Sequence, residues 1–166
     1  MLCAVLALAP CVAQKTNAPV PEACGPLGFS MAVNLNKSQH ALTPPEPGEA
    51  RIYFIQDSGE VFTLGYPTTR IGIDGKWVGA NKKNSYFSVS VEPGEQHLCA
   101  AIQSSLVGDN IEFAHFTAAA GQVYYYRTRL IFSEHGPEYL GLGPVDSDEA
   151  RYLIEEYPLA TAHAKK

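Results

Sequence analysis

Arg70-Ile-Gly-Ile-Asp-Gly-Lys-Trp-Val-Gly79 is the stretch that decides the fold of this chain. Asp74-Gly75 lies between two runs in which apolar residues alternate with other residues. An Asp-Gly pair in this position is the strongest short-range signal for a β-hairpin, because a type I′ turn needs positive φ at both central residues. The stretch therefore predicts two short antiparallel strands joined by a tight turn.

Apolar runs of strand length continue on both sides of this hairpin. Residues 51–56, 111–117 and 122–132 are rich in β-branched and aromatic residues, and Pro93-Gly94 marks a further turn. Apolar residues recur at every second position in three other runs, which are Ile71 with Ile73, Phe87 with Val89 and Val91, and Leu98 with Ala100 and Ile102. Closely spaced strands of this kind are typical of sandwiches and barrels. We predict an all-β fold in which residues 50–143 form a small antiparallel β-sandwich of about seven to nine strands.

The C-terminal part of the chain has a different pattern. Asp146-Ser-Asp-Glu149 can cap a helix, and its acidic residues complement the helix dipole. Leu153 and Tyr157 fall four residues apart on one helical face, and a proline follows them. We predict one short C-terminal helix over residues 146–157 and a disordered tail over residues 158–166.

The composition limits the class of protein. The chain has 166 residues, of which 46% are hydrophobic and 17% are charged, so it can bury one ordinary core as a single domain. The formal net charge is -5, and no run of Lys or Arg is longer than two residues. A nucleic-acid surface needs a basic patch or stripe, so we expect no nucleic acid among the partners.

Residues 1–13 carry no charge and are nearly all apolar. A short apolar run that ends in small residues, such as Cys11-Val-Ala13, is typical of a signal peptide. The run lacks a basic start, so we predict a signal peptide that is truncated at its N-terminus and cleaved before Gln14. On this interpretation the protein is exported to the periplasm or the cell envelope. The alternative is a frayed apolar N-terminus on a cytosolic protein.

Leu8-Ala-Pro-Cys11 suggests a second export route. It has the outline of a lipobox, in which a lipid is attached to the cysteine, but Pro10 stands where a small residue is expected. We favour a soluble secreted form and keep an outer-membrane lipoprotein, anchored through Cys11, as the alternative. Residues 14–49 are predicted to be a Pro-rich leader with room for one edge strand.

Two cysteines, Cys24 and Cys99, remain after the predicted cleavage. Isolated cysteines in an exported protein usually pair, so we expect a disulfide between them. The bond would close a loop of about 75 residues and contribute roughly 4 kcal/mol in the chain-entropy model. The alternative is two buried free thiols. Neither cysteine belongs to a C-x-x-C motif, so zinc and thioredoxin-type sites have no support.

The sequence contains no H-E-x-x-H, G-x-S-x-G or P-loop motif. His97 and His115 lie on strands expected to be neighbours, where two rings could meet, but a zinc site usually needs three or four ligands. We therefore expect no catalytic residues, no metal and no cofactor. Whether the protein is an enzyme stays open, and the non-catalytic interpretation is favoured.

Aromatic and basic residues form the most suggestive surface feature. Within Tyr124-Tyr-Tyr126, alternation places Tyr125 on the same face as Arg127 and Arg129. These three residues and Trp77 are the candidate surface for a ligand or partner, because aromatic residues and arginine recur at interfaces. The alternative is that these aromatic rings fill the core.

Four motifs together resemble those of a known group of proteins. They are Ala50-Arg-Ile-Tyr-Phe54, Ile73-Asp-Gly-Lys-Trp-Val-Gly79, Pro93-Gly-Glu-Gln-His97 and Ala118-Ala-Ala-Gly-Gln-Val-Tyr-Tyr-Tyr126. Over Ala50–Phe132 they resemble an uncharacterised family of bacterial envelope domains, whose members are small exported proteins or lipoproteins of unknown function. The hairpin is also similar to those of PEGA-type and transthyretin-like sandwich modules. The resemblance implies the fold and carries no activity with it.

From these features we expect a non-catalytic envelope protein, a structural or protein-interaction β-sandwich module. Its partner would be an unknown envelope protein. A carbohydrate-binding module with exposed aromatic residues is the alternative, with a glycan as the partner, and a hydrolase with an unrecognised site is third. A membrane would be contacted only through a lipid anchor.

Overall fold

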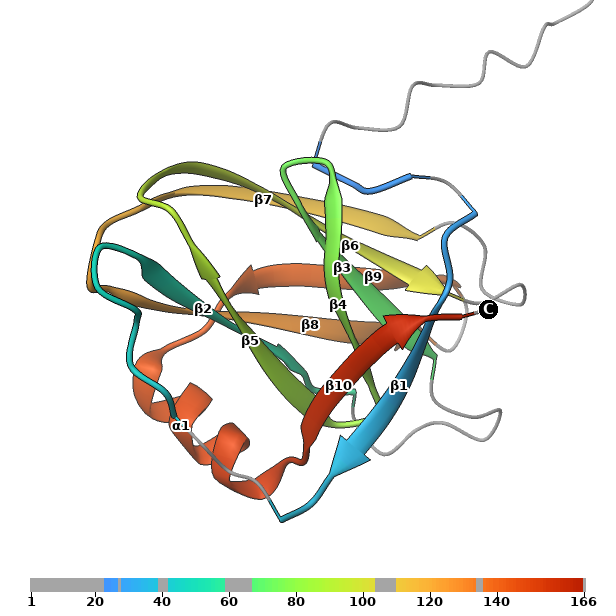
Figure 1. Cartoon of the computed structure of the whole chain (residues 1–166). Helices are drawn as coiled ribbons and strands as arrows, with labels where there is room; N and C mark the ends of the chain where they lie inside the picture. Colours follow the sequence, from blue (N-terminus) through green and yellow to red (C-terminus); the bar gives the residue numbers. More distant parts are fainter. Residues whose placement is uncertain are drawn as a thin grey trace, which may run out of the picture.

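The chain folds into two packed β-sheets and one short helix (Figure 1). The computed structural model describes residues 23–26, 28–38, 42–58, 67–103, 110–133 and 136–165, and for residues 131–133 and 136–139 it describes the backbone alone. The predicted signal peptide and Cys11 lie outside the described residues. No helix in these ranges has the length and apolar character needed to cross a membrane.

The strands belong to two sheets. They are β1 (Met31–Asn36), β2 (Ala50–Gln56), β3 (Thr68–Ile73), β4 (Lys76–Lys82), β5 (Ser85–Val91), β6 (Gly94–Gln103), β7 (Ile111–Ala118), β8 (Val123–Ser133), β9 (Gly136–Pro144) and β10 (Leu159–Ala164). The six-stranded sheet has the order β1-β10-β5-β2-β8-β9, and the four-stranded sheet has the order β4-β3-β6-β7. The all-β prediction with a C-terminal helix is confirmed.

The predicted hairpin joins β3 to β4. Asp74 has φ of 46° and Gly75 has φ of 82°, so both central residues of the turn have the positive φ that the Asp-Gly pair indicated. Ile71 pairs with Gly79 and Gly72 pairs with Trp77, which leaves Val78 as the extra residue of a β-bulge. A bulge bends its strand and increases the local twist.

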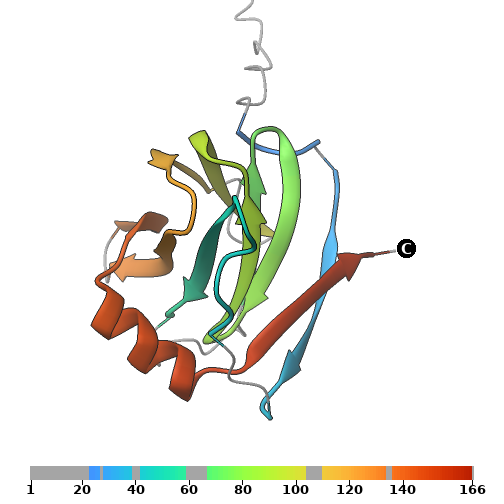
Figure 2. The same ribbon diagram turned by 60° about the vertical axis from the view of Figure 1, so that its left-hand side comes forward.

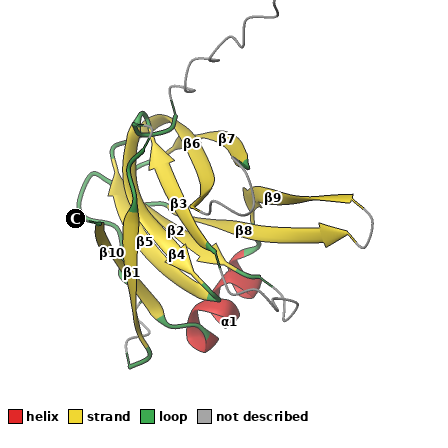
Figure 3. Cartoon of the chain, turned by 90° about the vertical axis from the view of Figure 1, so that its right-hand side faces the viewer, coloured by secondary structure: helices red, strands yellow, loops and turns green. Residues whose placement is uncertain are grey.

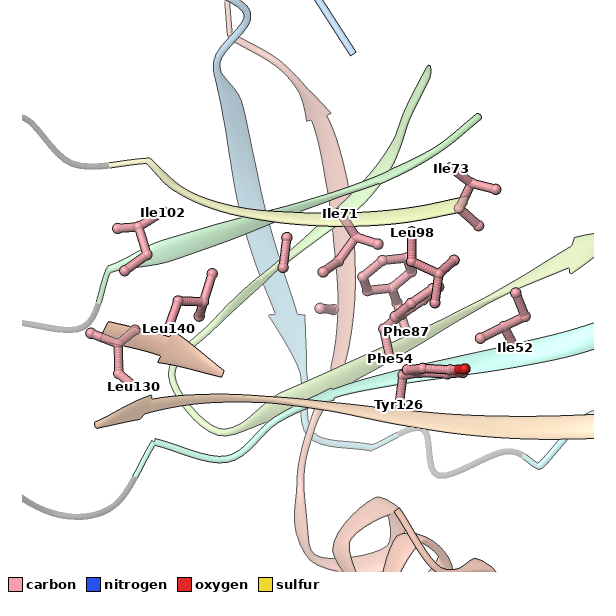
Figure 4. Close-up of a cluster of buried hydrophobic side chains, with 12 residues drawn as sticks. Ile52, Phe54, Ile71, Ile73, Phe87, Leu98, Ile102, Tyr126, Leu130 and Leu140 are labelled. Atoms are coloured by element: carbon pink, nitrogen blue, oxygen red, sulfur yellow. The ribbon is translucent and has the colours of Figure 1, made fainter. Parts of the chain in front are cut away.

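The main core lies between the two sheets (Figure 4). Phe54, Phe87 and Tyr126 of the six-stranded sheet face Ile71 and Leu98 of the other sheet. The apolar faces predicted from alternation in β3, β5 and β6 all pack in or against this cluster. The period-two pattern therefore gave the correct inward face of each strand.

Helix α1 (Ser147–Glu156) packs on the outer face of the six-stranded sheet (Figure 2, Figure 3). The Asp146 side chain accepts a hydrogen bond from the backbone N–H of Asp148, which caps the N-terminus as predicted. The buried residues Ala150, Leu153 and Ile154 contact Tyr53, Ile55 and Tyr86 in a second apolar cluster. The helix thus covers one side of the sandwich.

The chain after the helix differs from the prediction, because residues 159–164 form strand β10 where a disordered tail was expected. Every residue of β10 pairs with β1, from Met31 with Ala164 to Asn36 with Leu159. The strand is short and alanine-rich, so it lacks the β-branched and aromatic residues that identify strands in a sequence. Pairing with the edge strand β1 supplies the stability that its own composition does not.

Two strand pairs are parallel in a fold expected to be antiparallel. β2 pairs with β8 in parallel over six residue pairs from Arg51 with Val123 to Gln56 with Thr128, and β10 pairs with β5 in parallel only at Leu159 with Tyr86. Such pairs join strands that are distant in the sequence, and alternation within one strand does not indicate which neighbour it will have.

Candidate functional site

The residues predicted to form one surface lie on two opposite faces of the sandwich. Trp77 packs on the outer face of the four-stranded sheet, whereas Tyr125 packs on the outer face of the six-stranded sheet beside α1. Arg127 and Arg129 accompany Tyr125, as the alternation indicated. The structure therefore does not bring Trp77 together with the other three residues, and their role in binding stays a prediction.

Trp77 belongs to the contacts around a disulfide. Cys24 and Cys99 are bonded, with a Cα–Cα distance of 5.2 Å, and Cys99 is fully buried. The indole Nε1 of Trp77 donates a 3.0 Å hydrogen bond to the carbonyl oxygen of Pro26. The guanidinium of Arg70 lies 4.4 Å from the centre of the indole ring. The expected disulfide is confirmed, and Trp77 holds the segment that carries Cys24 against the sheet.

Glycine allows this segment to approach the sheet closely. A Cβ atom on Gly72 of β3 would lie 2.8 Å from the carbonyl oxygen of Ala23, and one on Gly25 would lie 2.3 Å from the Trp77 ring. Neither position leaves room for a side chain. The sequence around these glycines gives no local signal for the contact, because the two partners are far apart along the chain.

Tyr125, Arg127 and Arg129 serve to anchor α1. The Tyr125 ring stacks on Tyr53 at a centroid distance of 5.5 Å. The Arg127 guanidinium forms an ion pair with Glu149 of the helix and lies 3.8 Å from Oδ2 of Asp57. These contacts connect β8 to the helix through charge and through stacked rings.

Asp57 is the centre of this charged network. Its Oδ2 accepts a 2.5 Å hydrogen bond from Arg129, and its Oδ1 accepts a 3.0 Å hydrogen bond from the Tyr157 hydroxyl. Burial, together with the hydrogen bond to Asp57, raises the pKa of Tyr157 to about 12. The hydrogen bond to Asp57 also raises the pKa of Arg129. Both arginines have carboxylate partners, so this cluster fastens the helix to the sheet.

His97 and His115 are directly opposite each other on β6 and β7, as predicted. Nδ1 of His97 lies 3.2 Å from Oδ1 of Asp74, and Nε2 lies 3.5 Å from Oε1 of Glu95. Asp74 also accepts a hydrogen bond from the His97 backbone N–H. Among the described residues no group of three or more His, Cys, Asp or Glu side chains could hold a metal ion. Through its two contacts with Asp74, His97 supports the β3–β4 turn.

Sequence reasoning did not identify a groove of about 490 Å³ at the end of the sandwich where this turn lies. Its apolar lining comes from Ile73 of β3, Val78 of β4, and Val89 and Val91 of β5. Pro93 and a set of charged and polar residues complete the lining, and the latter are Asp74, Lys76, Ser90, Glu92, Glu95 and Gln96. Alternation indicated that Val89 and Val91 share one face of their strand with Phe87, but it could not show that part of this inner face lies open.

The groove exists because β4 and β5, which are consecutive in the chain, belong to different sheets. The two strands are in close contact at Gly79 of β4, where an added Cβ atom would lie 2.4 Å from the Phe87 ring of β5. The distance between the strands increases from their connecting turn toward the β3–β4 turn (Figure 1). The bulge at Val78 lies in the diverging part. Bulges commonly occur at the edges of sheets and next to binding sites.

Residues 46–143 match the model of a family described as a protein of unknown function (DUF2846). The chain belongs to the DUF2846 family. No curated protein and no solved structure matches the chain. The DUF2846 region runs from the turn before β2 to β9, and it includes every residue that lines the groove. Strands β1 and β10, helix α1 and Cys24 lie outside this region.

Proposed function

We propose that this DUF2846 protein is a non-catalytic module of the bacterial cell envelope that binds another protein. The disulfide between Cys24 and Cys99 supports a place outside the cytoplasm, because structural disulfides persist in oxidising compartments. The signal-peptide pattern of residues 1–13 points to the same compartment. Attachment to a membrane through a lipid on Cys11 belongs to this proposal as its lipoprotein variant.

The groove between β4 and β5 is the observation that carries the binding role. Four isoleucine and valine residues line it, and three of them, Val78, Val89 and Val91, are only partly buried. Concave apolar surfaces with a polar rim are the usual form of binding sites. The disulfide and the Asp57 network stiffen the two outer faces, so the scaffold around the groove is held rigid.

The glycan alternative receives less support from the geometry. A sugar-binding platform needs aromatic rings that share one exposed face, whereas Trp77 and Tyr125 lie on opposite faces and are engaged in internal contacts. The exposed rings of Phe113 and Tyr152 belong to β7 and α1, on different sides of the molecule. A protein is therefore the partner that we propose.

Photo-crosslinking in bacterial cells tests the binding role. A photoreactive amino acid is placed in turn at Glu92 on the groove, at Phe113 on β7 and at Arg151 on α1, all of which are exposed. A discrete adduct with an envelope protein from any of these positions is the expected result. Absence of adducts from all three positions contradicts a protein-binding role.

Fractionation with thiol labelling tests the compartment. The cells are fractionated into periplasmic, membrane and cytosolic fractions, free thiols are blocked under denaturing conditions, and cysteines released by subsequent reduction are labelled with a second thiol reagent. We expect oxidised Cys24–Cys99 protein outside the cytosol. A reduced protein confined to the cytosol contradicts the proposed location.

A further inference from the structure

Strand β5 leaves part of one edge without a neighbouring strand. On one side it pairs with β2 along its whole length, from Ser85 to Val91. On the other side β10 pairs with it only at Tyr86 and then continues along β1. Within the described ranges, no strand is paired with this side of β5 beyond Tyr86.

The hydrogen-bond pattern identifies the backbone groups at this edge. The backbone N–H of Arg51 in β2 donates to the carbonyl oxygen of Gln122, and the backbone N–H of Tyr86 in β5 donates to that of Pro158. Both N–H groups therefore point away from the β2–β5 ladder. Arg51 is opposite Ser90. Since direction alternates along an antiparallel strand, the N–H and C=O groups of Ser88 and Ser90 also point away from β2.

The apolar groove lies directly beside these groups. Val89 and Val91 of β5, Val78 of β4 and Ile73 of β3 line it, together with Ser90. A strand added to the β5 edge would continue the six-stranded sheet where β10 leaves it. Every second side chain of that strand would point into the groove, because side chains alternate across a sheet.

The rim of the groove carries excess negative charge. Asp74, Glu92 and Glu95 contribute three carboxylates, against one ammonium group from Lys76. A basic segment complements this rim. A second copy of this chain, docked through the same edge, would bring the two acidic rims together and is disfavoured by their repulsion.

We infer that the groove binds an extended segment of the partner protein, rich in alternating apolar and basic residues, as an additional strand beside β5. The inference rests on the proposed function and specifies the surface and the chemistry of its partner. Backbone hydrogen bonds to Ser88 and Ser90 hold the segment, and apolar side chains fill the groove over Val78, Val89 and Val91.

Nuclear magnetic resonance with amide hydrogen exchange tests the inference on the purified protein. The probe is a seven-residue synthetic peptide of alternating valine and lysine. In the free protein, we expect fast exchange at the amides of Ser88 and Ser90 and slow exchange at the amide of Val89, which faces Ile52 in the ladder. The peptide should slow exchange at Ser88 and Ser90. Slow exchange at both residues before the peptide is added overturns the inference.

Two control peptides separate strand addition from attraction by charge. One has glutamate in place of lysine, and the other keeps lysine but carries N-methyl groups at alternate positions, which removes hydrogen-bond donors. We expect each to bind at least about tenfold more weakly than the probe, a difference of about 1.4 kcal/mol. Equal binding of the N-methylated peptide overturns strand addition.

A matched pair of variants at Ser90 gives a second test. Ser90→Pro removes the outward N–H, which β2 does not use, and proline is tolerated at such edges. Ser90→Ala keeps the N–H and loses only the hydroxyl contact with Arg51. We expect probe binding to be lost in the first variant and kept in the second. If Ser90→Pro does not fold, the exposed Glu92→Lys variant replaces it, with binding of the lysine peptide reduced about tenfold.

These outcomes separate the inference from the proposed function. Cellular adducts from Phe113 or Arg151, with no probe binding at the β5 edge, would overturn the inference and leave the protein-binding role in place. Absence of adducts from every position together with probe binding would overturn the cellular role and keep the strand-accepting edge.

Discussion

The Tyr157 hydroxyl donates a 3.0 Å hydrogen bond to Oδ1 of Asp57, a residue 100 positions earlier in the chain. Tyr157 is the C-cap of α1, and Asp57 directly follows β2. The second carboxylate oxygen of Asp57 is bound by Arg129 of β8. One partly buried carboxylate thus connects a helix end to the end of β2 and to the middle of β8 in the six-stranded sheet.

Replacing this carboxylate should destabilise the fold. In Asp57→Ala, Tyr157 and Arg129 lose a shared acceptor whose side chain is only 15% exposed. We expect a loss of about 2 kcal/mol in the free energy of unfolding, the range for hydrogen bonds to charged groups. Urea denaturation measures this loss. Glu155→Ala, at an exposed position of the same helix, is the control, and an equal loss in both variants would show that Asp57 has no special role.

The raised pKa of Tyr157 predicts a dependence of stability on alkaline pH. Its pKa is about 12 in the folded protein and about 10 in the unfolded chain, so the folded state holds this proton more tightly. The resulting stability is fully present below pH about 10 and is lost as the pH rises toward about 12. Tyr157→Phe should therefore lose less stability over this interval than the wild type. Parallel curves for the two proteins would contradict the prediction.

The disulfide should account for a large share of the stability. Joining residues that are 75 positions apart restricts the unfolded chain, and the chain-entropy model gives about 4 kcal/mol for such a loop. A Cys24→Ser, Cys99→Ser double variant should lose most of this amount in urea denaturation. Unreduced, denatured mature protein that begins at Gln14, and so lacks Cys3 and Cys11, should show almost no reactive thiol. Two titratable thiols per chain would refute the bond.

The effect of a substitution at Gly75, in the turn between β3 and β4, on the stability of the protein should depend on whether the new residue accepts a positive φ. Gly75 has φ of 82°, a conformation that β-branched residues avoid and asparagine accepts. Gly75→Val should cost on the order of 1 kcal/mol or more, and Gly75→Asn should cost clearly less. Thermal unfolding of the two variants measures the difference. The same melting temperature for both would exclude backbone strain as the cause.

Local patterns in the sequence predicted much of the fold. The Asp74-Gly75 turn, the inward faces of β3, β5 and β6, and the capping of α1 by Asp146 all depend on residues within a few positions of each other. The disulfide was predictable because the predicted removal of residues 1–13 would leave only Cys24 and Cys99 to be paired. Turn chemistry, alternation and helix spacing act over this short range.

The contacts that shape the candidate site act over long range and were not predictable. Nothing around Asp57 in the sequence indicates that Arg129 and Tyr157 will meet it. The free β5 edge depends on where β10 leaves the sheet, and β10 has too little strand propensity to be recognised. The groove is therefore a property of sheet order, which no single strand encodes.

The pairing of β1 with β10 sets an order of events in folding. In the described sheet, β1 lies at an edge and β10 is its one neighbour, so the first strand pairs with the last. Closing so long a segment of chain is entropically costly, and folds dominated by such contacts form slowly. During synthesis from the N-terminus, β1 must wait unpaired until the final strand has emerged. A nascent chain halted after α1 would expose both β1 and the whole outer edge of β5.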